Sequence, residues 1–264
     1  MRNQIACFVL FLFVFNSSLW AAGSANGASA DSYFKGAQDM YENGAFMPCV
    51  DLCYQAISIK KDRRYYILLG HALKDVENRK LSYRAFKDAL NLIITEAGSS
   101  NSGHKTNVEE VLLKDDDYTG LLPLLVSQSI DLRKFDETKE LIGRYKAYDA
   151  DSARMSSERL YLEMGRLKLE SGMYASAYRH YAKAANYSTT KIRSKRGCAN
   201  ALSGLAISLE ESGENPAKLL SVLLRLYRFR DNDDTVIRIQ AAFIRAGKPA
   251  EKKEIVEKIT KAAN

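Results

Sequence analysis

The residue types that most often carry chemistry are few in this chain and widely spaced. His71, His104 and His180 are its only histidines, and none of them belongs to an HExxH sequence, whose spacing holds a zinc ion on one helix face. The chain also contains no CxxC pair, no nucleophile elbow and no glycine-rich phosphate loop. The sequence therefore predicts no catalytic residue, no metal site and no cofactor.

The densest acidic run is Asp115, Asp116 and Asp117. A calcium loop needs oxygen ligands at spaced positions and a glutamate at its end, and this run has neither. Short polar side chains such as aspartate often cap the start of a helix. We therefore interpret the run as a solvated loop that caps a helix beginning after Tyr118.

The first thirty residues predict an export signal. A single positive charge precedes eleven apolar residues, Ile5–Phe15, and small residues follow. This order is typical of a secretory signal peptide, and the run is shorter than the roughly 20 residues of a membrane-spanning helix. We expect cleavage between Ala30 and Asp31, where the helical pattern begins; a second small-residue site after Gly23 and an uncleaved anchor are the alternatives. The mature protein is then periplasmic or secreted.

Three cysteines remain after such cleavage, Cys49, Cys53 and Cys198, so at least one thiol is unpaired within the chain. Cys49 and Cys53 are four residues apart, which places them on one face of a helix. We interpret both as small residues of the core. A strained bridge between them, or a bond to another chain, is the alternative.

The composition fits a folded, helical protein. The chain has 264 residues, of which 46% are hydrophobic and 27% are charged, and these values exclude a wholly disordered chain. Four prolines and fifteen glycines are few for an all-β protein. The net charge of +7 is modest, so it favours electrostatic steering of a partner over tight nonspecific binding.

Two segments show apolar residues at helical spacing with a short polar break between them. One comprises Tyr65–Leu73 and Ser82–Leu92, and the other is Ser156–Tyr187. Apolar residues three or four positions apart predict amphipathic helices, and a short break between two such helices predicts a hairpin. Gly172, in the second break, suits the left-handed residue that ends many helices. The sequence therefore predicts an all-α fold built from helical hairpins.

These two hairpins also share the intervals between their small residues. Gly70 and Ala89 are nineteen residues apart, as are Gly165 and Ala184. With the aromatic residues between them, these positions resemble the tetratricopeptide repeat (TPR), a unit of about 34 residues. The resemblance spans 31–262, strong in two units, fair in one and weak in three. It implies a solenoid of stacked hairpins, because a single hairpin cannot bury both of its faces.

The repeat pattern is interrupted where glycine, serine and asparagine become frequent. An insertion longer than about 12 residues without structure is usually functional or a linker. We therefore expect four parts: a signal peptide at 1–30, N-terminal repeats at 31–95, a mobile loop or linker at 96–118, and C-terminal repeats with a capping helix at 119–264.

The resemblance implies that the first helix of each hairpin lines a concave groove. The groove positions are basic, aromatic or aliphatic, and the pattern assigns them to Phe34, Gln38, Tyr41, Arg64, Ile67, His71, Lys74, Arg159, Leu162 and Arg166. Such a groove suits an acidic or C-terminal peptide segment. The alternative is that the charges only solvate helix faces. The lysine and asparagine clamp of chaperone-tail-binding members is absent, since Phe34 and Ile67 stand at two of its positions.

A second basic feature is a group of four positive charges in six residues, Lys191, Arg193, Lys195 and Arg196. In an exported protein this anionic-surface patch favours an envelope polymer, a lipid headgroup or an acidic protein face over nucleic acid, and it leaves peripheral contact with a membrane open.

Together these features predict a non-enzymatic scaffold or adaptor of the bacterial cell envelope. It would bind envelope proteins and support an assembly of the outer membrane, cell wall, pilus or flagellum. The alternative is a periplasmic ligand-binding protein that holds a hydrophobic or anionic small molecule. Its sign would be a closed apolar cavity near Tyr41, Ile67 and Leu162.

Overall fold

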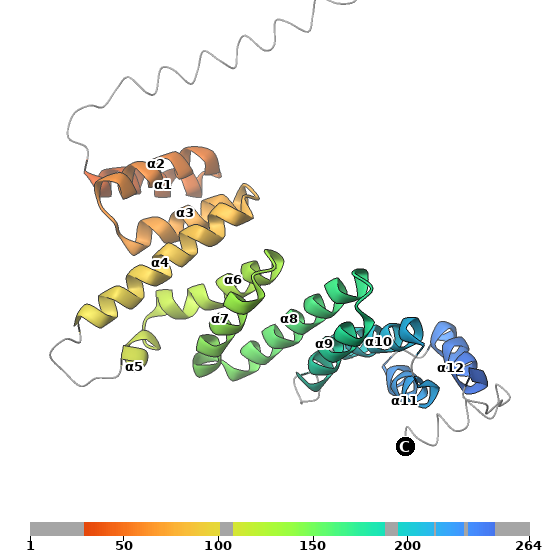
Figure 1. Ribbon diagram of the computed structural model, residues 1–264. Coiled ribbons are helices and arrows are strands. Elements are labelled where there is room, and N and C mark those ends of the chain that lie inside the picture. The colour runs from red at the N-terminus through yellow and green to blue at the C-terminus, as the bar shows by residue number, and fades with distance from the viewer. Residues whose placement is uncertain (1–28, 101–107, 188–194, 214, 230–231, 246–264) are drawn as a thin grey trace, which may run out of the picture. The chain divides into compact units, whose positions relative to one another are not determined.

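The computed structural model describes residues 29–100, 108–187, 195–213, 215–229 and 232–245, and every regular element in these ranges is an α-helix (Figure 1). The helices are α1 (Ala30–Glu42), α2 (Phe46–Ile59), α3 (Arg63–Asp75), α4 (Arg79–Ser100), α5 (Val108–Leu112), α6 (Asp116–Asp131), α7 (Phe135–Tyr148), α8 (Ala150–Glu170), α9 (Tyr174–Tyr187), α10 (Lys195–Ser212), α11 (Pro216–Tyr227) and α12 (Asp233–Arg245). The predicted all-α fold is confirmed. None of these helices combines the length and apolarity that crossing a membrane requires.

The chain forms two compact units, residues 1–105 and 106–264. Unit 1 contains two hairpins, α1/α2 and α3/α4; unit 2 contains α6/α7, α8/α9 and α10/α11, with α5 before them and α12 after them. Within each unit, every hairpin packs against the next one along the chain. This is the stack of helical hairpins that the sequence predicted. The predicted signal peptide core and the predicted capping helix beyond residue 245 lie outside the described residues.

Small residues let the two helices of a hairpin approach closely. A Cβ atom at Gly70 of α3 would lie 2.5 Å from the ring of Phe86 on α4, and one at Gly165 of α8 would lie 2.9 Å from Tyr181 on α9. Ser82 is fully buried beside the first contact, and its hydroxyl donates to the Gly70 carbonyl oxygen at 2.8 Å. Both glycines therefore allow close packing of the two helices of their hairpin.

Hairpin turns use a left-handed residue, but not always a glycine. Gly172 has φ of 68°, and the N–H of Met173 donates to the Lys168 carbonyl at 2.8 Å, which closes α8 as predicted. Glu77 and Arg133 take the same left-handed conformation in their turns, with φ of 59° and 60°. A side chain strains this conformation, so these two turns are less stable than one made by glycine.

The structure corrects the loop expected at 96–118. Helix α4 continues to Ser100 because Leu90, Ile93 and Ala97 keep a buried stripe at helical spacing. Helices α5 and α6 then occupy 108–112 and the residues from Asp116 onward. Residues 101–107, which include His104, lie outside the described residues.

The acidic run opens α6 and does not precede it. Asp115 is the N-cap, and its Oδ1 accepts a hydrogen bond from the backbone N–H of Tyr118 at 3.0 Å. Asp116 and Asp117 lie in the first turn, where the helix dipole favours negative charge. The capping role is therefore confirmed, but the helix begins earlier than predicted.

Helix α1 begins one residue before the expected mature N-terminus. Ser29 is its N-cap, with Oγ accepting from the backbone N–H of Ser32 at 3.2 Å. Ala30 is only 6% exposed and packs in one cluster with Ala56 and Tyr65. Ser29 and Ala30, which precede the expected cleavage site, are therefore part of the folded unit.

Candidate partner-binding surface

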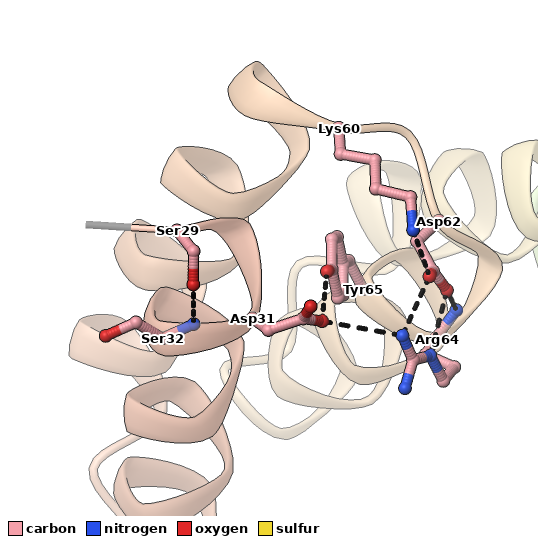
Figure 2. Close-up of polar contacts among 7 residues, drawn as sticks. All are labelled: Ser29, Asp31, Ser32, Lys60, Asp62, Arg64 and Tyr65. Carbon is pink, nitrogen blue, oxygen red and sulfur yellow. Dashed lines mark hydrogen bonds and ion pairs between the residues drawn. The ribbon is translucent and has the colours of Figure 1, made fainter. Parts of the chain in front are cut away.

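Asp62 and Arg64 are the polar centre of the side of unit 1 formed by α1 and α3 (Figure 2). Asp62 caps α3, and Arg64 donates to its carboxylate from Nε at 3.0 Å and from Nη2 at 2.9 Å. Lys60 lies 3.6 Å from the same carboxylate. The hydrogen bonds from Arg64 lower the pKa of Asp62 to about 2, and the same contact raises the pKa of Arg64.

Aromatic and acidic side chains of α1 complete this network. The hydroxyl of Tyr65 donates to Asp31 at 2.8 Å, and the Arg64 guanidinium lies 3.5 Å from the same carboxylate (Figure 2). The ring of Phe34 lies 4.8 Å from the ring of Tyr65, and the guanidinium carbon of Arg64 is 5.6 Å from the Phe34 centroid. Burial and then Asp31 raise the pKa of Tyr65. The structure thus brings together two predicted groove residues, Phe34 and Arg64.

The other end of α1 and α3 is joined by Tyr41. Its hydroxyl donates to Asp75 at 2.7 Å, and burial together with this carboxylate raises the pKa of Tyr41 to about 12. Gln38 and Lys74 are exposed, while Ile67 is half-buried. We call the set Phe34, Gln38, Tyr41, Arg64, Ile67 and Lys74 the first-helix face of unit 1.

His71 differs from its predicted neighbours. Its ring packs edge-on against Phe86 of α4, with 5.0 Å between the centroids, and the side chain is half-buried. Burial and the nearby Lys74 lower the pKa of His71, so burial favours its neutral form. His71 therefore supports the α3/α4 hairpin more than it contributes to an exposed surface.

In unit 2, Arg159 joins α8 to α6. Its guanidinium donates to Ser127 at 2.9 Å and to Asp131 at 2.7 Å, both on α6. One turn along α8, Leu162 is half-buried. Arg166 pairs with Glu163 and with Glu170 on its own helix. The hydrogen bonds from Arg166 lower the pKa of Glu163. We call the set Ser127, Asp131, Arg159, Leu162, Glu163 and Arg166 the first-helix face of unit 2.

The predicted basic character of these faces is corrected. Each of the three predicted arginines pairs with carboxylates of this chain: Arg64 with Asp31 and Asp62, Arg159 with Asp131, and Arg166 with Glu163 and Glu170. The pairs are largely exposed, so each adds little to stability. Their main effect is on charge, because they leave both faces nearly neutral.

The predicted anionic-surface patch is mostly outside the described residues. Lys191 and Arg193 precede the start of α10, and Lys195 and Arg196 are its first two residues, whose side chains lie outside the described part of the chain. Binding of an anionic surface by this patch stays a prediction.

Cys49 and Cys53 are fully buried in α2, as the core interpretation predicted. Their sulfur atoms are 4.0 Å apart, well beyond the length of about 2 Å of a disulfide bond. The contact with Cys49 and burial raise the pKa of Cys53. Among the described residues, no three metal-ligating side chains of the His, Cys, Asp or Glu type gather at one place.

A pocket that the sequence analysis missed lies in unit 2 between α7, α8 and α9. It has a volume of about 550 Å³ and is lined by Lys139, Ile142, Gly143, Lys146, Ala150, Asp151, Ala153, Arg154, Ser157, Leu160, Tyr161 and Tyr187. The one local signal for it in the sequence is Gly143, which lies in the interior of α7. Leu162, where the ligand-binding alternative expected a cavity, does not line it.

Comparison with known proteins finds similar solved structures. YrrB, described as a TPR protein with an unusual peptide-binding site, aligns over 81% of this chain and 92% of its own, with 13% identity and a TM-score of 0.45. MamA aligns over 83% of this chain and 92% of its own, with 14% identity and a TM-score of 0.41. A tetratricopeptide repeat protein of Parabacteroides merdae aligns over 90% of this chain and 81% of its own, with 14% identity and a TM-score of 0.41. No family model and no curated protein matches the sequence.

Proposed function

We propose that this protein is a non-enzymatic scaffold that binds a segment of a partner protein on its first-helix faces. The observation that carries the proposal is the bridge from Arg159 on α8 to Ser127 and Asp131 on α6. It joins the first helices of two successive hairpins, so their exposed side chains form one continuous surface. Tyr41 and Tyr65 join α1 to α3 in the same way in unit 1.

Such a surface suits an extended or helical segment better than a small molecule. Stacked hairpins form a rigid, elongated support, and each hairpin adds a further strip of side chains to the binding surface. The half-buried side chains of Phe34, Ile67 and Leu162 offer apolar contacts beside the ion pairs. This pattern is that of a peptide site, in which pockets anchor side chains and polar groups fix the register.

The ion pairs change the partner that the sequence predicted. A carboxylate arriving at Arg159 would have to compete with Asp131, and one arriving at Arg166 with Glu163 and Glu170. The gain from such an exchange is small in water, because one exposed ion pair replaces another. We therefore propose a segment of mixed charge for these faces, in place of a strongly acidic one.

We further propose that the scaffold acts in the bacterial cell envelope after export. The charged start, the apolar run of Ile5–Phe15 and the small residues after it support export. Ser29 and Ala30 support cleavage after Gly23 in place of Ala30, because removing them would delete the α1 cap and a buried residue. Cleavage after Ala30 would also place a positively charged amino group at the start of α1, where the helix dipole disfavours positive charge. The mass of the exported chain distinguishes the two sites.

A crosslinking pull-down from the native source tests the scaffold. The tagged chain, expressed with its own leader, is compared with Arg159→Glu/Arg166→Glu and with a control, Arg144→Glu/Arg179→Glu. The control reverses a half-buried arginine on α7 and an exposed arginine on α9. We expect one envelope protein to be recovered with the wild type and the control and lost with the first variant. Arg159→Gln/Arg166→Gln, which adds no negative charge beside Asp131 or Glu163, repeats the test without new repulsion.

Circular dichroism and melting temperature establish that all variants remain folded, as expected for positions outside the core. Equal recovery of the same proteins with every variant would contradict the assignment of the first-helix face. Recovery of lipid or glycan without any protein would favour the ligand-binding alternative.

A further inference from the structure

The pocket between α7, α8 and α9 has an apolar floor. Ile142, Ala153 and Leu160 are buried there, and Ser157, also buried, turns its hydroxyl to the Ala153 carbonyl at 2.9 Å. The volume of about 550 Å³ lies within the range of roughly 300–1,000 Å³ that is usual for ligand sites. The floor can therefore accept an apolar group of the size of one or two side chains.

One wall of the pocket is aromatic. The rings of Tyr161 on α8 and Tyr187 on α9 are stacked, with 5.6 Å between their centroids and 10° between their planes. Lys183 lies over the Tyr161 ring at 5.3 Å. An aromatic side chain inserted here would extend an existing stack, a contact that contributes more than its buried area alone.

The rim of the pocket is basic. Lys139, Lys146 and Arg154 line it, against the single carboxylate of Asp151. Asp151 pairs with Arg154 at 2.6 Å, and Lys139 pairs with the exposed Asp136 outside the lining, so these two pairs neutralise part of the rim. Lys146 makes no ion pair with any described residue. Unlike the first-helix face of unit 2, whose arginines are all paired, this surface keeps the positive charge of Lys146 for a partner.

His180 lies beside the aromatic wall of the pocket. Its ring stacks on Tyr161 with 6.1 Å between the centroids. Burial, then Lys183, Lys168 and Lys139, lower the pKa of His180. Cations from three helices thus act on one point beside the aromatic wall.

Gly143 opens the pocket from α7. It lies in the helix interior, where glycine costs about 0.5–1 kcal/mol relative to alanine. A Cβ atom at Gly143 would meet no other atom within 4 Å, so close helix packing does not explain the glycine. The absent side chain leaves free space in the pocket wall instead.

The pocket and the first-helix face of unit 2 lie on opposite sides of α8. Successive residues of an α-helix are rotated by about 100°. By this rotation, the pocket residues Ala153, Ser157 and Leu160 are centred about half a turn from Arg159, Leu162 and Arg166. The two surfaces can therefore be occupied at the same time and tested separately.

We propose that this pocket is a second docking site, which binds an acidic peptide segment through one inserted aromatic side chain. The inference rests on the proposed scaffold function and adds a second partner segment to it. The aromatic side chain would stack on Tyr161 and Tyr187 above the apolar floor. A carboxylate next to it in the segment would pair with Lys146.

Selection from a phage-displayed library of random short peptides tests the proposal. The bait is the chain purified after expression with its own N-terminal segment. We expect enriched peptides that combine acidic residues with phenylalanine, tyrosine or tryptophan. A synthetic peptide of the most enriched sequence then measures affinity for the variants by fluorescence anisotropy.

Two variants block the pocket in different ways, each with a matched control. Gly143→Leu fills the space, while Gly120→Leu adds the same side chain at an exposed glycine of α6 that also meets no atom within 4 Å. Lys146→Glu reverses the rim charge, while Arg144→Glu makes the same change on the opposite side of α7. We expect each pocket variant to weaken binding by at least about tenfold and each control to leave it unchanged. The two leucine variants should melt at or above the wild-type temperature, because glycine is unfavourable in a helix interior.

Three outcomes would overturn the proposal. Peptides lost with Arg159→Glu/Arg166→Glu but retained by Gly143→Leu would leave the scaffold function standing and remove the pocket from it. Enriched peptides without acidic residues would contradict the charge argument. Binding of small aromatic carboxylates in place of any peptide would make the pocket a small-molecule site.

Discussion

The hairpins α3/α4 and α8/α9 use the same contact but place it in different surroundings. Among the described glycines, Phe86 contacts only Gly70, whereas Tyr181 contacts Gly165 of its own hairpin and Gly204 of α10, where a Cβ atom would lie 2.4 Å from the ring. The ring of Tyr181 therefore joins two hairpins as well as two helices. The comparison shows that the aromatic residue at one repeat position can pack within its own hairpin only, or can also contact the next hairpin.

The aromatic layers beside these contacts also differ. In α3/α4, His71 closes over Phe86 edge-on. In α8/α9, His180 stacks on Tyr161, and Tyr187 extends the stack to the edge of a pocket. The first hairpin thus uses its aromatic residues for packing, while the second leaves Tyr187 exposed at the pocket.

The largest effect is expected from side chains added at these glycines. Gly165→Leu and Gly204→Leu should each destabilise unit 2 by about 3 kcal/mol, because overpacking and strain add together. Gly70→Leu should act as strongly in unit 1, since its Cβ would lie 2.5 Å from Phe86. Urea unfolding measures each change. Gly120→Leu is the neutral control, and an equally neutral Gly165→Leu would mean that the repeat register is wrong.

The next effect concerns the helix caps. Asp62 caps α3 and Asp149 caps α8. Asp62→Ala should lower stability by about 1 kcal/mol, because it removes a cap. Asp149→Ala should lower it less, since Asp149 has no arginine partner among the described residues. Melting temperatures of the two variants measure the difference, and a larger loss for Asp149→Ala would contradict the role given to Arg64.

The Asp62 contact should also depend on pH. Its folded-state pKa of about 2 lies below the value of about 3.9 for a free aspartate, so its charge stabilises the fold at neutral pH. This stabilisation is fully present above about pH 4 and is lost as the pH falls towards 2. Asp62→Asn keeps a capping side chain and removes the charge. The stability gap between it and wild type should therefore shrink over this range, and a constant gap would exclude the ionic contribution.

The smallest effect is expected in the turns. Glu77 holds a left-handed conformation where the second hairpin has Gly172. Glu77→Gly should stabilise unit 1 by about 0.5–1 kcal/mol, and Gly172→Ala should destabilise unit 2 by about 1 kcal/mol. Thermal unfolding followed by circular dichroism detects both shifts. Two changes of the same sign would show that the turns are not equivalent.

The hairpin framework could be predicted because its signals are local. Gly70 and Gly165 are required by close packing against an aromatic residue of the next helix, at the same interval in both hairpins, and Gly172 is required by a turn. The end of α4 could not be predicted in this way. Its polar residues favour a loop, and only the burial of Ile93 and Ala97 within unit 1 keeps it helical.

The charge and the pocket depend on contacts that are distant in sequence. Asp131, which neutralises Arg159, lies 28 residues before it. Glu163 and Glu170 lie three and four residues from Arg166 on the same helix, so that pairing was readable from the sequence. The pocket joins Ile142 to Tyr187 across three helices, and no single segment shows it.

Site-specific photocrosslinking in the native source tests the account most directly. A photoreactive residue is placed at Gln38 or Leu162 on the first-helix faces. The exposed Tyr54 on α2 and the half-buried Arg144 on α7 are the control positions. The account predicts that Gln38 and Leu162 crosslink to an envelope protein and that the two controls do not. Crosslinks confined to Tyr54 and Arg144 would contradict it.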